Sequence, residues 1–335
     1  MNVKSLVSPA RKDGKPVVGV HQFEVELQAP FRLEQTVWGL RRRAHNLLDR
    51  WDGSYYARSL VVEGYPLRLR VGQLFCQDQT KARLSVDLDS PGRDFSNSMI
   101  AEVRQILERV LGLNEDLSGF YEMAGHNVTL STIAKKFLGF RPPCFPSVFE
   151  AMINAVACQQ LSLDVGIHLL NRLTFNYGAS ISGYSDDDRT FPTAEALGGA
   201  DQAHLRSLGF SRSKAGTIAL LANQVAGGEV DLEGLEELDD PEASAALMRF
   251  RRIGRWSSEY TLLRGLGRWH ILPGDDIGAR NNLQKHFGLP ADANYDTVKE
   301  FCKSWWPYGG IVYFHLLLDS LASKGYLSGS AGSNL

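Results

Sequence analysis

Apolar and polar residues alternate with a period of two in the first third of the chain, and the pattern then changes. The strand-like alternation covers residues 23–28, 59–73 and 82–90, and the Gly64-Tyr65-Pro66 turn divides the middle stretch into two strands. Residues 99–113 change to a period near 3.6 and run into Gly112, which predicts an amphipathic helix. We therefore expect residues 21–112 to form an α+β domain with an antiparallel sheet and one or two helices.

Beyond residue 113 the pattern is almost entirely helical, and Gly and Pro separate the segments. Apolar residues recur at helical spacing in five of them, at 148–161, 165–178, 214–226, 257–266 and 311–325. Residues 113–330 are thus expected to be mainly α-helical. The first 20 residues and the final SGSAGSNL are expected to be flexible tails.

Composition narrows the class of protein. The chain has 335 residues, 44% hydrophobic and 22% charged, which excludes disordered, collagen-like and coiled-coil proteins. No apolar stretch approaches the ~18 residues of a membrane span, and the N-terminal residues lack the apolar core of a secretory leader. The four cysteines form no C-x-x-C pair, so we expect reduced thiols in a cytoplasmic protein, with neither a zinc knuckle nor an iron–sulfur cluster.

Charge is distributed unevenly along the second half of the chain. The net charge of −2 argues against a uniformly basic surface but leaves room for a local patch. Residues 229–242 carry eight carboxylates and no basic residue, and are expected to be a solvated loop. Residues 249–285 carry eight Lys/Arg against three carboxylates. That segment is either a charged helix face or a nucleic-acid contact.

The sequence Phe250-Arg251-Arg252-Ile253-Gly254-Arg255-Trp256 lies inside the basic segment and favours the nucleic-acid contact. One helix is expected to end there in a tight turn, and a second begins with free N–H groups after Gly254, which permits a close backbone approach. Such a helix N-terminus binds a phosphate without needing a cationic side chain.

A pair of carboxylates follows at a fixed distance. Asp276 comes 22 residues after Gly254, in the sequence Leu272-Pro273-Gly274-Asp275-Asp276. The simpler interpretation is a turn and an N-cap for the helix expected at 277–287. The functional interpretation is a carboxylate held at a helix start, over a hairpin that faces DNA.

The hairpin, the spacing and the aspartate together resemble the helix-hairpin-helix DNA glycosylase superfamily, and within it the alkylbase glycosylases of the DNA-3-methyladenine glycosylase II type. Three further segments agree with this resemblance, namely 54–60 (SYYARSL), 254–260 (GRWSSEY) and 306–308 (WPY). The similarity covers residues 22–325. It implies a two-lobed helical region, with a central lobe at about 141–268 and a second lobe made of about 113–140 and 269–330.

The resemblance also implies roles for individual residues. Asp276 matches the catalytic aspartate, and Asp275 the turn acid beside it. Aromatic side chains would line the pocket for a flipped base, backbone carbonyls would hold a Na or K ion in the hairpin, and the remaining positions would contact DNA, with Gln160 as the wedge side chain. These positions are Trp256, Tyr260 and Tyr308 for the pocket, Met248, Phe250 and Ile253 for the carbonyls, and Gln160, Leu161, Arg251, Arg252, Gly254 and Arg255 for DNA. Gln160 could instead be an ordinary polar residue at a helix end, and the aromatics could be core residues.

The chain departs from the family pattern at four positions. Arg251 and Arg252 replace the usual Pro and first Gly of the hairpin, which predicts a less tight turn. Ile277 stands where an aromatic often follows the aspartate, and Gly309 where an arginine is common. These differences bear on the shape of the pocket and on the choice of lesion.

The implied activity is removal of alkylated bases of the 3-methyladenine and 7-methylguanine type from double-stranded DNA in base excision repair. Bifunctional relatives use a lysine nucleophile at the position of Trp256, so a monofunctional hydrolase is expected. Asp276 would stabilise the oxocarbenium-like transition state or activate water, without any catalytic cofactor. We expect a monomer associated with the nucleoid and no membrane partner. The alternatives are an oxidised-purine glycosylase and a non-catalytic protein that binds damaged DNA.

Overall fold

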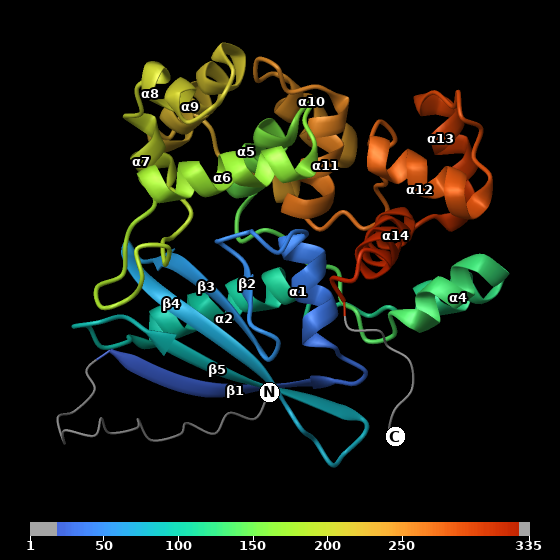
Figure 1. Ribbon diagram of the computed structural model, residues 1–335, viewed down its shortest axis with the longest axis horizontal. Coiled ribbons are helices and arrows are strands. Elements are labelled where there is room, and N and C mark those ends of the chain that lie inside the picture. The colour runs from blue at the N-terminus through green and yellow to red at the C-terminus, as the bar shows by residue number, and fades with distance from the viewer. Residues whose placement is uncertain (1–18, 328–335) are drawn as a thin grey trace.

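A five-stranded antiparallel sheet forms the N-terminal part of the molecule, as predicted (Figure 1). This computed structural model describes residues 19–327, so the predicted tails lie outside the described residues except for Gly19 and Val20, the latter the first residue of β1. The strand order is β1-β5-β4-β3-β2. The strands are β1 (Val20–Gln28), β2 (Arg50–Trp51), β3 (Tyr55–Val62), β4 (Tyr65–Leu74) and β5 (Lys81–Asp89).

Two helices cover one face of this sheet. Helix α2 (Asn97–Leu111) is the predicted amphipathic helix, and it buries Met99, Val103 and Leu107 against the strands. The Ser96 side chain caps its first turn, and Gly112 ends it with a φ of 58°. Helix α1 (Leu33–Arg41) packs beside α2, and its position had no clear periodic signal in the sequence.

The rest of the described chain is helical, which confirms the predicted fold class of a sheet domain followed by a mainly helical region. The helices are α3 (Ser118–Gly125), α4 (Val128–Lys136), α5 (Val148–Cys158), α6 (Leu163–Tyr177), α7 (Ala194–Gly198), α8 (Gln202–Ser207), α9 (Arg212–Ala226), α10 (Asp240–Met248), α11 (Arg255–Gly265), α12 (Ile277–Phe287), α13 (Tyr295–Cys302) and α14 (Gly309–Ser323), with 3-10 turns η1 (Glu233–Glu237) and η2 (Lys303–Trp305). One hydrophobic cluster joins α5–α11, and another joins α3, α4 and α12–α14.

The sheet domain and the helical region meet at α5 and α11. The hydrophobic cluster of the sheet also contains Ala151 and Ala155 of α5 and Tyr260 of α11. A buried ion triad crosses the same boundary: Arg58 of β3 pairs with Asp49 at 2.6 Å and with Glu150 of α5 at 2.5 Å. Removing one partner of such a triad leaves an unpaired buried charge, at a cost of about 3–5 kcal/mol. The ion triad therefore fixes α5 of the helical region to the sheet domain.

The acidic segment 229–242 is largely exposed to solvent, as predicted, but it is not simply a loop. It contains η1 and the start of α10, where Asp239 forms a capping box with Glu242. The Glu233 carboxylate accepts a hydrogen bond from the Val148 backbone N–H at 2.7 Å, and Asp240 pairs with Arg268 at 3.0 Å. Carboxylates serve here as helix caps and ion-pair partners, because backbone donors and an arginine from distant segments lie beside them.

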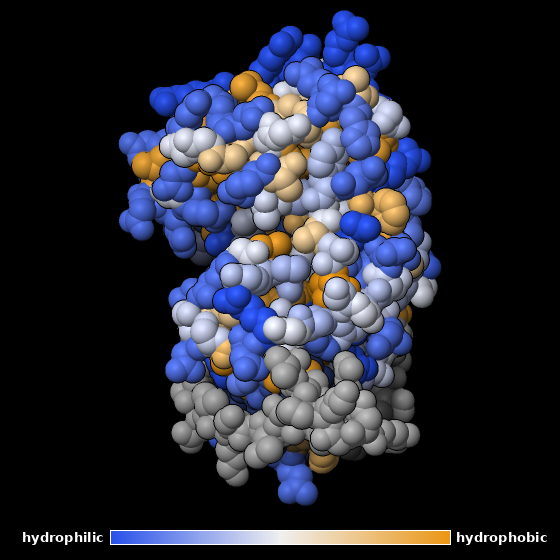
Figure 2. All heavy atoms as spheres, turned by 90° about the vertical axis from the view of Figure 1, so that its left-hand side faces the viewer, coloured by the Kyte–Doolittle hydropathy of each residue, from blue (hydrophilic) through white to orange (hydrophobic). Residues whose placement is uncertain are grey.

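None of the helices between residues 19 and 327 is long and apolar enough to cross a membrane. The space-filling view from the α7–α8 side shows a mostly hydrophilic surface, hollowed at the boundary between the helices and the sheet domain (Figure 2).

Candidate DNA-binding and catalytic site

The predicted hairpin joins α10 to α11 through residues 249–254. The turn is closed by a hydrogen bond from the Ile253 N–H to the Phe250 carbonyl at 3.0 Å. Arg252 adopts a left-handed φ of 72°, a conformation that glycine adopts at little cost. The turn thus keeps a conformation that suits glycine, and the strain falls on Arg252. No side chain caps Gly254, so the first N–H groups of α11 have no side-chain partner in the described structure.

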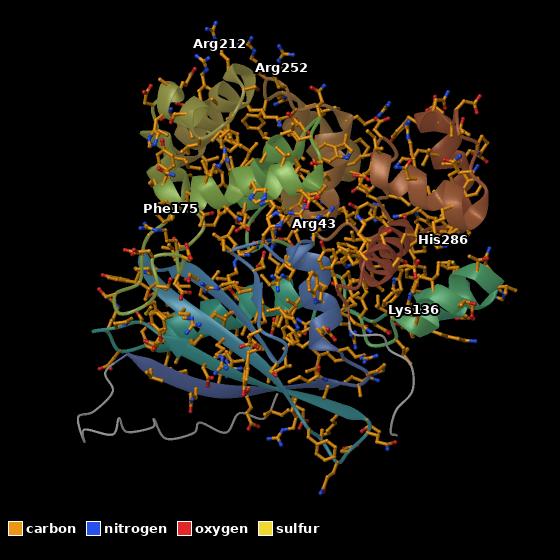
Figure 3. The ribbon with its side chains drawn as sticks, viewed as in Figure 1. Arg43, Lys136, Phe175, Arg212, Arg252 and His286 are labelled. Carbon is orange, nitrogen blue, oxygen red and sulfur yellow. The ribbon has the colours of Figure 1, made fainter. Side chains whose placement is uncertain are left out.

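Two side chains, one from α9 and one from the residue that follows α5, bind carbonyl groups of the hairpin backbone. Thr217 of α9 donates its hydroxyl to the Arg251 carbonyl at 3.1 Å. Gln159, next to the predicted wedge residue, donates to the Arg252 carbonyl at 2.9 Å and to the Ser257 hydroxyl at 2.8 Å. The side chains of Arg251 and Arg252 are themselves exposed. Figure 3 shows Arg252 extending from the same edge of the molecule as Arg212, the first residue of α9.

Each oxygen of the Asp276 carboxylate accepts one hydrogen bond. Asp276 is the N-cap of α12: its Oδ1 accepts from the Ala279 N–H at 2.7 Å, and its Oδ2 accepts from the Trp256 Nε1 at 3.0 Å. The neighbouring Asp275 bridges Arg255 and Arg280, at 2.8 Å and 2.9 Å. Two adjacent carboxylates therefore have different partners, one an indole and a helix start, the other two guanidinium groups.

One face of α11 holds the whole loop 274–276. Arg255 binds the Asp275 side chain, Trp256 binds the Asp276 side chain, and Glu259 accepts from the Gly274 N–H at 3.0 Å. These three residues lie within one turn of the helix that starts at the hairpin. The hairpin and the aspartate loop are consequently parts of one rigid arrangement around the N-terminus of α11.

The aromatic residues predicted to form a pocket are only partly brought together. Trp256 and Tyr260 stack with ring centroids 5.3 Å apart. Tyr308 instead packs edge-on against Phe120, at 6.2 Å, in the cluster of α14. Among the described residues, Tyr308 has no hydrogen bond or ring contact with Trp256, Tyr260 or Asp276.

Sequence reasoning missed several residues beside these aromatics. Arg42, which follows α1 in the sheet domain, donates to the Tyr260 hydroxyl at 2.7 Å and to Asn154 at 3.0 Å. Burial, and then the charge of Asp276, raise the pKa of Tyr313, so that this tyrosine stays protonated. The run of arginines at 41–43 was visible in the sequence, but nothing local indicates that Arg42 reaches a residue 218 positions away.

The predicted wedge residues lie on the turn between α5 and α6. Gln160 is exposed with a left-handed φ of 53°, and Leu161 is 42% exposed. Lys214 ties this turn to α9 by donating to the carbonyls of Ala157 and Gln159, at 2.9 Å and 2.7 Å. The turn thus exposes Gln160 and Leu161, while Lys214 fixes the residues that precede them. One of these is Gln159, which also binds the hairpin.

The positions where the chain departs from the family pattern have distinct surroundings. Ile277 is 75% exposed beside Asp276. Trp306, in the matching WPY segment, is 73% exposed. Gly309 lies against the segment that leads to the aspartate loop, since a Cβ there would stand 3.0 Å from the His270 carbonyl oxygen.

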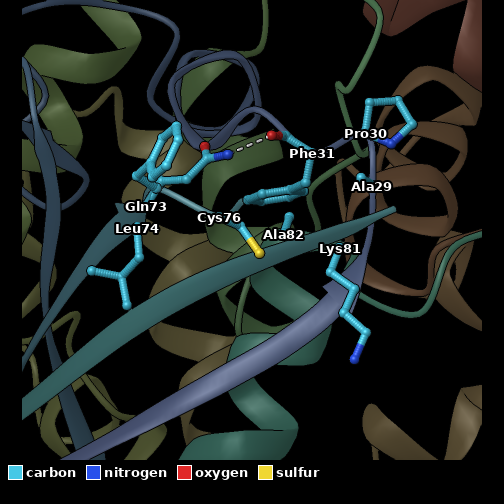
Figure 4. Close-up of a pocket in the computed structure, with 9 residues that line it drawn as sticks. Ala29, Pro30, Phe31, Gln73, Leu74, Cys76, Lys81 and Ala82 are labelled. Atoms are coloured by element: carbon cyan, nitrogen blue, oxygen red, sulfur yellow. Dashed lines mark hydrogen bonds between the residues drawn. The ribbon is translucent and has the colours of Figure 1, made fainter. Parts of the chain in front are cut away.

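A separate pocket lies on the sheet domain, where the ends of β1 and β4 meet the start of β5 (Figure 4). Its volume is about 440 Å³, and Gln73 donates to the Phe31 carbonyl across it at 2.6 Å. None of the predicted site residues lines it. Its ionisable side chains are Cys76 and Lys81, and Lys81 forms an ion pair with Glu26 at 2.6 Å.

The chain is similar to known DNA repair proteins in sequence and in fold. Residues 153–308 match the model of the HhH-GPD superfamily base excision DNA repair proteins. The chain is 27% identical over 215 residues to a DNA-3-methyladenine glycosylase of Bacillus subtilis, covering 64% of this chain and 71% of that protein. It is 23% identical over 295 residues to DNA-3-methyladenine glycosylase 2 of Escherichia coli, covering 88% and 96% of the two chains. The solved structure of a 3-methyladenine DNA-glycosylase from Archaeoglobus fulgidus has the same fold, with a TM-score of 0.74, 24% identity, and 88% and 97% of the chains covered.

Proposed function

We propose that this chain is a DNA glycosylase that hydrolyses the N-glycosidic bond of alkylated bases in base excision repair, since residues 153–308 match the model of the HhH-GPD superfamily base excision DNA repair proteins. The observation that carries the proposal is the Asp276 carboxylate, oriented by two hydrogen bonds and joined through α11 to a hairpin with free N–H groups. The names of the curated relatives support the same activity. Double-stranded DNA with a damaged base is the proposed partner.

The hairpin would anchor the DNA strand. The first N–H groups of α11 offer donors to a phosphate, and Arg251, Arg252 and Arg255 add positive charge nearby. The nucleotide must leave the stack before its base can be attacked, and Gln160 or Leu161 on the exposed turn would fill the gap.

The family's monovalent cation would sit on the backbone carbonyls of Met248, Phe250 and Ile253. The Phe250 carbonyl already accepts one hydrogen bond, from Ile253, which leaves a second lone pair. Carbonyl oxygens are suitable ligands for Na or K. When bound, the ion would supply a positive charge to a DNA phosphate and no chemistry at the base.

Asp276 would act on the sugar. An N3- or N7-alkylated purine carries a positive charge, so it leaves with the electron pair of the glycosidic bond as a neutral base. Positive charge then develops at C1′, and the carboxylate stabilises it. Water adds to C1′, and its proton passes to Asp276 or to solvent. The Trp256 ring, half-buried and stacked on the buried Tyr260, suits a cationic base, because a ring face attracts a cation by ~0.5–2 kcal/mol.

The reaction would stop at an abasic site. Trp256 has no amine, whereas bifunctional relatives carry a lysine at this position, so no Schiff base is expected there. The strand should remain intact after the base is released.

Two measurements on one reaction test this proposal. Duplex DNA treated with a methylating agent should release 3-methyladenine and 7-methylguanine, identified by chromatography, while untreated duplex releases neither. The strand should be cut only after alkali, and borohydride should trap no protein–DNA adduct. Absence of base release would overturn the glycosylase function, and a trapped adduct would overturn the monofunctional mechanism alone.

A further inference from the structure

Glu259 is a buried carboxylate that the proposed mechanism does not use. It is 7% exposed and lies on α11, four residues after Arg255. Its Oε2 accepts from the Gly274 N–H at 3.0 Å, while its Oε1 accepts from the Tyr295 hydroxyl at 2.6 Å and lies 2.9 Å from Lys299 Nζ. Every partner belongs to the aspartate loop or to α13, and both carboxylate oxygens are occupied.

Gly274 is fixed on three sides. Glu259 takes its N–H, and Arg280 donates Nε to its carbonyl at 2.8 Å. The ring of Tyr295 closes the third side, because a Cβ on Gly274 would stand 2.8 Å from it. This peptide lies two residues before Asp276, so a shift of Gly274 would also displace Asp276.

We propose that Glu259 is a positioning residue, whose hydrogen bond to Gly274 holds the aspartate loop so that Asp276 faces the sugar. The inference rests on the proposed glycosylase function. Both oxygens of Glu259 face the loop and α13, so the carboxylate would act through Asp276 and not by contact with the DNA. Tyr295 and Lys299 in turn fix the Glu259 carboxylate, and burial followed by the hydrogen bond to Glu259 raises the pKa of Tyr295, which keeps its hydroxyl a donor.

This role predicts a specific kinetic pattern. In Glu259→Leu the Gly274 N–H loses its acceptor and the loop shifts; a misplacement of about 1 Å can cost about 100-fold in rate. We expect the single-turnover release of 7-methylguanine to fall about 100-fold, with the DNA affinity changed less than threefold because the hairpin is intact. In Glu259→Gln the amide oxygen can still accept from Gly274, so the rate should stay within about fivefold of the parent.

A double-mutant comparison tests whether Glu259 acts through Asp276. In an Asp276→Asn background, Glu259→Leu should slow the residual release of 7-methylguanine by less than threefold, since residues that act as a unit are not additive. The exposed Glu300→Leu, on α13, is the matched control and should leave the rate unchanged. Equal rate losses in the Leu and Gln variants, or an additive double variant, would overturn the positioning role.

A second readout does not depend on activity. Amide hydrogen exchange in the peptide covering residues 272–277 should be at least tenfold faster in Glu259→Leu than in the parent, and close to the parent in Glu259→Gln. If exchange behaves in this way but the parent releases no alkylated base, the result supports the positioning of the loop by Glu259 and contradicts the glycosylase function. If the parent is active and exchange is the same in all three proteins, the positioning role of Glu259 is contradicted and the glycosylase function is supported.

Discussion

The hairpin at 249–254 and the aspartate loop at 274–276 lie at the same end of α11, but they differ in whether their polar groups have partners within the protein. In the loop, both oxygens of Asp276 and both polar backbone groups of Gly274 have partners within the protein. At the hairpin, the N-cap Gly254 has no side-chain cap, and Arg251 and Arg252 form no ion pair with any residue between 19 and 327.

The difference follows from where each segment finds its partner. A group that binds an external phosphate must keep its donors free, whereas a carboxylate that stabilises charge in a transition state is most effective when it is already oriented. The turn backbone is nevertheless held by Thr217 and Gln159, so only the groups that face outward are free. We infer that the hairpin keeps its donors free to bind a phosphate, whereas the loop holds the Asp276 carboxylate in a fixed orientation. Variants in the two segments should therefore have different effects.

The largest effect is expected at the loop. Asp276→Asn should reduce base release by at least about 1,000-fold, because the charge opposite C1′ is lost. Asparagine is also a good N-cap, so α12 should stay folded. DNA binding should survive or tighten, since one negative charge near phosphate is removed. Single-turnover base release and a filter or fluorescence binding assay measure the two properties.

The neighbouring aspartate gives the control. Asp275→Asn removes the same charge from the same loop, but its amide oxygen can still accept from Arg255 or Arg280. We expect a rate loss of about tenfold or less. If Asp276→Asn kept near-parent activity, or if both variants were equally slow, Asp276 would not have the distinct role proposed for it.

A smaller loss is expected when only one bond to the carboxylate is removed. Trp256→Phe keeps a ring stacked on Tyr260 but deletes the indole N–H that donates to Asp276. A hydrogen bond to a charged group contributes about 1.5–3 kcal/mol, so a rate loss of about tenfold or more is expected. Trp306→Phe, at an exposed indole, should change the single-turnover rate less than twofold. A Trp256→Phe rate equal to the parent would show that the loop does not need α11 to orient Asp276.

The features that could be predicted from the sequence are those carried by local patterns. The alternating strands, the amphipathic α2 and the hairpin followed by an aspartate pair all depend on residues close together in the chain. The contacts of Arg42 with Tyr260 and of Glu259 with Gly274 could not be predicted, because they join segments that only the folded packing brings together. At 229–242 the composition predicted the exposure but not the η1 turn, the start of α10 or the contacts with Val148 and Arg268, which lie in distant segments.

Tyr308 shows a related limit. Its place in a three-residue motif predicts a pocket role by resemblance; in the structure the half-buried ring contacts Phe120, and the pocket role stays a prediction. An aromatic residue in a sequence motif looks the same whether it faces a cavity or a core, and only neighbouring elements such as α3 decide between the two.

At the hairpin, the expected effect is on binding and not on chemistry. Replacing both Arg251 and Arg252 with Ala should weaken DNA binding at low salt, and should flatten the slope of log affinity against log salt by between one and two units, since each phosphate contact contributes about 0.9. Base release at saturating DNA should be nearly unchanged, because such contacts position the duplex. Replacing both with Lys keeps the charges and should keep the slope. An unchanged slope in the Ala variant would mean that the helix N-terminus alone binds the phosphate.

The smallest effect separates strain from charge within the hairpin. Arg252 has a φ of 72°, which costs a non-glycine residue about 1–2 kcal/mol, whereas the neighbouring Arg251 has no positive φ. Arg252→Gly should therefore raise the free energy of unfolding by about 0.5–1 kcal/mol after allowing for the flexibility of glycine in the unfolded chain. Arg251→Gly should lower it by a similar amount, as glycine gains nothing there. Each variant loses one cation, so their DNA affinities should fall alike while their melting temperatures move in opposite directions. If both variants melted lower than the parent, the left-handed residue would not be a strained substitute for glycine, and the hairpin would tolerate arginine at no cost.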